Sequence, residues 1–198
     1  MVYSNWMVNN MSKYVKVMYG TTSGANSNFG YKLNEVNISN NWNPTAENGK
    51  DFGGFNYAEE DSIIRWLHRG DTIYDVEVPK DAECVKLEGA TTIYRANKII
   101  VKNPRKINDA LALHFYEISN IPEKSYYKTL AVVSLMNYEK TAYRILKDKV
   151  TSNNIDLVLD EWNNFFSHKG QNDRNVSTKL IEEITSKLHE IKLSKGEK

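Results

Sequence analysis

The residues with the clearest capacity for chemistry lie in one short segment near the N-terminus. Residues 20–24 read Gly-Thr-Thr-Ser-Gly and directly follow an apolar run that ends at Tyr19. Two glycines around three hydroxyl-bearing residues leave backbone amides accessible, and such amides can bind a phosphate or a ribose. The spacing is not that of a GxxxxGK[ST] loop, because no lysine follows Gly24. Two interpretations stay open, a ligand-binding loop and a polar turn between strands.

Two pairs of ionisable residues farther along the chain are weaker candidates. His68 and Arg69 precede Gly70 at the expected end of a helix, where positive charge suits the helix dipole. A catalytic pair is therefore the less favoured interpretation. Asp75 and Glu77 alternate along an expected strand, which indicates solvated carboxylates more than a catalytic pair. No spacing of His, Cys, Asp and Glu matches a metal site, and we predict none.

Composition narrows the class of protein. The chain has one cysteine, Cys84, so it forms no internal disulfide, and we expect a reducing compartment. No cationic cluster adjoins Cys84 in the sequence, which favours a structural, buried or half-buried thiol. The formal net charge is +1, which gives no overall attraction to nucleic acid or to an anionic membrane. The first residues lack a signal-peptide pattern and no apolar run is long enough for a membrane span, so we predict a cytoplasmic protein.

Hydrophobic periodicity divides the chain into two regions that must position these residues. We expect a flexible leader over residues 1–11 and a strand-rich domain over residues 12–107. A short helix is expected after Asn56 and Glu59, which have the spacing of a capping box. A helical domain is expected over residues 108–198. The expected strands cover residues 13–19, 29–38, 54–58, 71–79, 82–89 and 91–104, with a long loop over 39–54 anchored by Trp42.

Four motifs of the strand-rich region resemble those of the ADP-ribosyltransferase-like fold. The first reads MYGTTS from Met18, and the second reads GGFNYA from Gly53. The third reads YDVEVPKDAECV from Tyr74, and the last reads YRANKIIV from Tyr94. The resemblance covers about half of the chain. It implies an α+β protein in which a split antiparallel β-sandwich binds NAD and a C-terminal helical domain follows.

The resemblance also implies roles for individual residues. Gly20 and Thr21 match the Gly-Thr of the first motif, and Tyr19 stands where the family often has histidine. An aromatic residue of the second motif stacks on nicotinamide in that family, although aromatic residues in a strand are usually part of the core. The implied catalytic positions are Tyr19, Tyr57 and Asn97. The implied NAD-binding positions are Gly20, Thr21, Thr22, Ser23, Phe55 and Arg95.

The chain departs from the family at the third motif position. Arg95-Ala96-Asn97-Lys98 contains no glutamate. In the family that glutamate stabilises an oxocarbenium-like transition state, an electrostatic role that the uncharged Asn97 cannot fill. Two functions therefore stay open. One is an NAD-using ADP-ribosyltransferase that modifies a macromolecular target, and the other is a catalytically inactive binding or inhibitor module of a phage or mobile element.

Partner predictions follow from the surface residues that each function would use. A protein target is expected for the transferase, and the inactive module would present Trp162, Phe165 and Phe166 of the helical domain. A local basic run predicts nucleic-acid contact as a further alternative. Its members are Arg95, Lys98, Lys102, Arg105 and Lys106. The sequence leaves the oligomeric state open.

Overall fold

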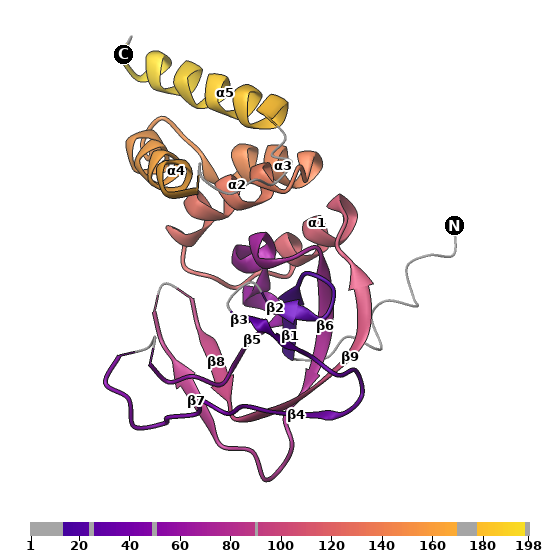
Figure 1. The fold of residues 1–198 in the computed structure, drawn as a ribbon. Coiled ribbons are helices and arrows are strands. Elements are labelled where there is room, and N and C mark those ends of the chain that lie inside the picture. Colours follow the sequence, from indigo (N-terminus) through magenta and orange to yellow (C-terminus); the bar gives the residue numbers. More distant parts are fainter. Residues whose placement is uncertain (1–13, 24–25, 49–50, 90, 170–177, 197–198) are drawn as a thin grey trace. The chain divides into compact units, whose positions relative to one another are not determined.

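The computed structural model describes residues 14–23, 26–48, 51–89, 91–169 and 178–196, and it is a mixed α and β fold (Figure 1). The chain divides into two compact units. The strand-rich first unit runs to Ile63 and resumes over Arg69–Ile107, and the helical second unit comprises Ile64–His68 and the chain from Asn108 onward. The expected leader and Gly24 lie outside the described residues.

One antiparallel sheet of seven strands forms the framework of the first unit (Figure 1). Its order is β4-β9-β6-β1-β5-β8-β7. The strands are β1 (Tyr14–Met18), β4 (Val36–Ile38), β5 (Phe55–Glu59), β6 (Thr72–Glu77), β7 (Cys84–Leu87), β8 (Ile93–Ala96) and β9 (Lys98–Lys106). A separate pair is formed by β2 (Thr22–Ser23) and β3 (Asn26–Gly30).

The two central strands are buried on both faces. Residues 15–18 of β1 and residues 72–76 of β6 are all buried. This arrangement overturns the expectation for Asp75, which was predicted to be solvated and is 6 % exposed. Glu77 is exposed as predicted. The alternation of polar and apolar residues in β6 indicated one solvated face, but the burial of residues 72–76 shows that the folded chain covers both faces of this strand.

Two expected strands are each divided in the structure. The segment 29–38 contains the end of β3, a turn and β4. The segment 91–104 is broken at Asn97 into β8 and β9. β9 continues past Pro104, because Asn103 adopts a φ of 48° where the β6·β9 register shifts. A bulge of this kind leaves one residue unpaired and lets the ladder resume beyond it.

The expected short helix is η1 (Glu60–Arg69), which has 3-10 geometry. Ile63, Ile64 and Leu67 are fully buried, as their spacing predicted. The capping-box prediction is wrong, because Asn56 lies inside β5 and no side chain caps the start of η1.

Five α-helices make up the second unit (Figure 1). They are α1 (Asp109–Glu117), α2 (Ser125–Leu135), α3 (Glu139–Lys149), α4 (Ile155–Lys169) and α5 (Thr178–Gly196). α2 packs against α3, α4 and α5, which explains why it is buried on nearly every side. Trp162 and Phe165 of α4 are also buried, so the expected contact surface of aromatic side chains is instead core of this unit.

Candidate site at the meeting of β1, β5 and β8

The Gly-Thr-Thr-Ser segment forms a hairpin turn. Tyr19 and Thr22 exchange two backbone hydrogen bonds of 3.0 Å around Gly20 and Thr21. Gly20 has a φ of 52° while Thr21 does not have positive φ, which is the pattern of a type II′ turn. The amide of Thr22 is thus used to close the hairpin. Gly20, Thr21 and Thr22 are exposed, and Ser23 is buried.

Core side chains hold this turn in place. The hydroxyl of Tyr74 donates to the carbonyl of Gly20 at 2.7 Å, and the amide of Tyr31 donates to the carbonyl of Thr21 at 2.8 Å. The turn interpretation therefore accounts for the glycine and the hydroxyl-bearing residues of the segment without a ligand.

Phe55 and Tyr57, the predicted stacking positions, belong to the core. Phe55 is 2 % exposed, and its ring lies 4.9 Å from that of Phe29. Tyr57 is 5 % exposed and is stacked on Tyr94 with ring centroids 5.5 Å apart. Neither ring has a free face for nicotinamide in this conformation, which is the physical reason to correct that expectation.

Cys84 lies on the edge strand β7 and is exposed, so the expectation of a buried or half-buried thiol is wrong. An edge strand has no neighbour on one side to cover its side chains. Burial raises the pKa of the Tyr57 hydroxyl, and its hydrogen bond with Cys84 raises that pKa further.

Asn97 has a structural role at the break between β8 and β9. Its backbone amide donates to the carbonyl of Glu83 at 3.1 Å, and its side-chain oxygen accepts from the amide of Glu83 at 2.9 Å. Its carbonyl accepts from the amide of Ser39 at 2.8 Å. These bonds tie three segments together, and they leave the Asn97 carboxamide oxygen engaged.

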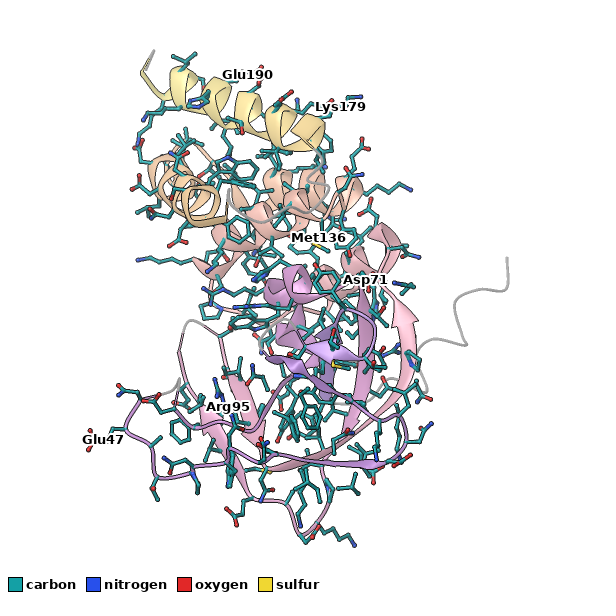
Figure 2. All side chains as sticks on the ribbon, in the orientation of Figure 1. Glu47, Asp71, Arg95, Met136, Lys179 and Glu190 are labelled. Atoms are coloured by element: carbon teal, nitrogen blue, oxygen red, sulfur yellow. The ribbon has the colours of Figure 1, made fainter. Side chains whose placement is uncertain are left out.

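Among the predicted ligand-binding residues, Arg95 is the one that lies beside other polar groups without a full set of hydrogen-bond partners. It lies on β8 directly opposite Asn56 of β5. One guanidinium nitrogen, Nη1, donates to the carbonyl of Gly53 at 2.9 Å. The Arg95 Nε is buried and has no hydrogen-bond partner among the described residues. Figure 2 shows Arg95 among the strands of the first unit.

Lys16 approaches the same place from β1. The β1·β5 ladder has only two residue pairs, Tyr14 with Glu59 and Val15 with Ala58. Just beyond it, the Lys16 Nζ donates to the carbonyl of Asn56 at 2.6 Å. The Lys16 ammonium group thus takes the place of the next hydrogen bond between β1 and β5. Its acceptor belongs to Asn56, which lies opposite Arg95.

Burial dominates the electrostatics of both cations. Lys16 is 4 % exposed, and loss of solvation together with the nearby Arg95 charge lowers its pKa to about 7. Burial also lowers the pKa of Arg95. Within the described part of the chain, the hydrogen-bond partners of both cations are backbone carbonyls, and neither forms an ion pair. Buried Lys16 and half-buried Arg95 thus have no negatively charged partner among the described residues.

Asn56 adds a neutral donor and acceptor to this group. It is half-buried, and its carboxamide forms no hydrogen bond with any other described residue. Lys16, Asn56 and Arg95, here called the β1–β5–β8 site, therefore combine two charges and one free amide. The sequence analysis missed Lys16 and Asn56. The available signal was a lysine at the centre of the otherwise hydrophobic strand Tyr-Val-Lys-Val-Met.

Four cations of the predicted basic run lie on β9 and differ from this site, because each of them is paired, whereas the fifth, Arg95, belongs to the site. Lys98 pairs with Asp81, Lys102 with Glu77, Arg105 with Asp75, and Lys106 with Asp71. These four are consequently neutralised within the first unit and present no stripe of positive charge. Four of the five cations of the predicted nucleic-acid contact are thus already paired with acids, and the contact itself stays a prediction.

A buried acid cluster lies beside one of these pairs. Burial raises the pKa of Glu60 to about 7, against the opposing effect of Arg105, and nearby Asp75 raises it further. Asp75 is also bonded by Asn103 at 2.8 Å. In the described residues no group of three or more His, Cys, Asp or Glu side chains could hold a metal ion.

The helical unit has a shallow depression of about 280 Å³ between α1, α2 and α3. Its lining residues are Tyr116, Glu117, Ser119, Tyr126, Arg144, Asp148 and Lys149. Arg144 Nε donates to Asp148 at 2.6 Å, and Lys149 pairs with Glu123 and lies over the Tyr126 ring. Its charges therefore satisfy one another, in contrast to those of the β1–β5–β8 site.

Comparison with known proteins adds no assignment. No family model, curated protein or solved structure matches this chain. Among the described helices, none is both long and apolar enough to cross a membrane.

Proposed function

We propose that the strand-rich unit binds a small phosphate-bearing ligand at the β1–β5–β8 site. The observation that carries this proposal is the pair of cations formed by buried Lys16 and half-buried Arg95, whose hydrogen-bond acceptors among the described residues are neutral carbonyls. A buried charge without a counter-ion costs free energy, so such charges are normally paired. An anion bound at this site would offset that cost.

The donors at the site suit a phosphate group in particular. A guanidinium group can direct two N–H groups at a phosphate, and the Arg95 Nε has no other partner in the described chain. Lys16 would contribute a point charge, and the free Asn56 carboxamide a neutral hydrogen bond. The resemblance of the motifs to ADP-ribosyltransferases makes NAD the first phosphate-bearing ligand to test.

Binding without group transfer is the form of this function that the residues favour. The third motif position holds Asn97, whose carboxamide oxygen is bonded to Glu83 and which carries no negative charge. Positive charge at the site would disfavour an oxocarbenium-like transition state, since like charges repel. A binding module is therefore proposed in preference to an active transferase.

Calorimetric titration with pyrophosphate and with NAD tests this proposal. We expect binding of at least one of them, with a matching ligand-dependent rise in melting temperature. Arg95→Gln should weaken binding about tenfold or more, because it removes a charge-assisted hydrogen-bond donor. Lys102→Gln is the matched control and should bind as the wild type, since Lys102 is already paired with Glu77.

Two results would overturn the proposal. One is the absence of binding of either compound at millimolar concentration to a folded protein. The other is equal affinity of the wild type and the Arg95→Gln variant, with circular dichroism showing that both are folded. Incubation with labelled NAD and a cell extract separates binding from transfer, and we expect no labelled protein.

A further inference from the structure

The indole ring of Trp42 is held in one orientation by two contacts. Its Nε1 donates to the Glu83 carboxylate at 2.7 Å. The ring also packs on the backbone of Gly54, where a Cβ atom would lie 2.6 Å from Trp42 Cε3. Gly54 has a φ of 68°, so the absence of a side chain serves both the turn and the close approach of the ring.

The Trp42 ring borders the same stretch of backbone as the β1–β5–β8 site. Gly53, which precedes Gly54, supplies the carbonyl that Arg95 bonds. The same Cβ position on Gly54 would lie 2.7 Å from the carbonyl of Ala96, the residue after Arg95. Trp42 is half-buried, so part of its ring is accessible to solvent next to the backbone that Arg95 contacts.

We propose that Trp42 determines the class of ligand that the β1–β5–β8 site binds. That ligand carries a planar heteroaromatic ring joined to a phosphate, as a nucleotide does. The inference rests on the proposed function, because the cations must first hold the phosphate. Stacking of a base on an aromatic side chain is favourable and tolerates different bases. A ring already fixed by Glu83 and Gly54 loses little conformational freedom when a ligand stacks on it.

Titration with AMP and with ribose 5-phosphate tests the inference, because these probes share sugar and phosphate and differ in the base. The wild type should bind AMP roughly tenfold or more tightly than ribose 5-phosphate. Trp42→Leu should reduce that ratio to within about twofold while ribose 5-phosphate affinity is kept. Trp42→Phe, which retains an aromatic ring, should keep most of the preference for AMP.

The outcomes separate this inference from the proposed function. Equal wild-type affinities for the two probes, with both weakened in Arg95→Gln, would overturn the role of Trp42 alone. A preference for AMP that survives in folded Trp42→Leu would overturn it as well. Binding of neither probe to a protein that does bind pyrophosphate would overturn the role of Trp42 alone, whereas binding of none of these phosphate compounds would overturn the proposed function. The wild-type comparison needs no variant, so it decides even if Trp42→Leu does not fold.

Discussion

Two groups of cations in one antiparallel sheet have opposite electrostatic surroundings. Lys102, Arg105 and their neighbours on β9 each pair with an acid of the same unit. Lys16 is buried on β1, Arg95 is half-buried on β8, and both donate to carbonyl oxygens. The basic residues of β9 are neutralised by acids of the same unit. Lys16, which lies within a hydrophobic strand, has no acidic partner among the described residues.

Strand register produces this difference. The β6·β9 register places Asp75 opposite Lys102 and Ile73 opposite Arg105, so that carboxylates of β6 lie within reach of cations on β9. The β5·β8 register places the neutral Asn56 opposite Arg95. Opposite charges on adjacent strands stabilise a sheet, and a cation without such a partner is available to a ligand. A cluster of basic residues is thus weaker evidence for binding than a single unpaired one.

The largest effect is expected when the ion pair between Arg105 of β9 and Asp75 of β6 is broken. Arg105→Ala leaves the carboxylate of Asp75, whose side chain is 9 % exposed, without its cation. We expect a loss of about 3 kcal/mol in the free energy of unfolding, measured by urea denaturation.

A double variant serves as the control for this prediction. Asp75→Asn combined with Arg105→Ala should be less destabilised than the sum of the single changes, because residues in contact are coupled. Strict additivity would show that the two side chains do not depend on each other. It would contradict the distinction between the paired cations of β9 and those of the β1–β5–β8 site.

A change of opposite sign is expected at the unpaired lysine. Lys16→Met keeps a long side chain and removes a buried charge, so it should raise the free energy of unfolding at pH 7 by about 1 kcal/mol. The same variant should bind pyrophosphate more weakly than the wild type.

The pH dependence of stability identifies the charge as the cause. The folded-state pKa of Lys16, about 7, lies below its ordinary value of 10.5. Between these values the unfolded chain binds more protons, so wild-type stability gains a contribution as pH rises. The advantage of Lys16→Met should therefore shrink between pH 7 and pH 10 in urea denaturation. Parallel pH profiles for the two proteins would contradict this assignment.

The smallest effect is expected at an exposed pair. Lys102→Gln removes an ion pair whose side chains are 36 % and 58 % exposed. The free energy of unfolding should change by less than about 1 kcal/mol, and less still in 0.5 M salt. A loss as large as that of Arg105→Ala would show that exposure does not separate the two kinds of pair.

Much of the local structure could be predicted from the sequence. Alternation at Val15 and Val17 predicted β1, and the spacing of Ile63, Ile64 and Leu67 predicted the buried side of η1. A polar turn was one of the two interpretations of the segment after Tyr19, and the structure has a hairpin turn at Gly20. These features depend on residues close together in the chain, where periodicity and backbone preference decide.

The candidate site could be predicted only in part, because it depends on strand order. Arg95 was identified from its motif, but nothing local indicated that Lys16 would lie beside Asn56, forty residues away. The burial of Phe55, Tyr57 and Asp75 likewise follows from neighbours on other strands. The break at Asn97, fixed by Glu83, has the same kind of origin.

The sequence by itself thus determined the strand β1, the buried side of η1, the helical character of the second half and which residues are charged. Only the tertiary structure decided which of those charges are neutralised. The physical reason is that a charge is compensated by whatever lies within a few ångströms of it. In a sheet with the order β4-β9-β6-β1-β5-β8-β7, those neighbours come from strands far apart in the chain.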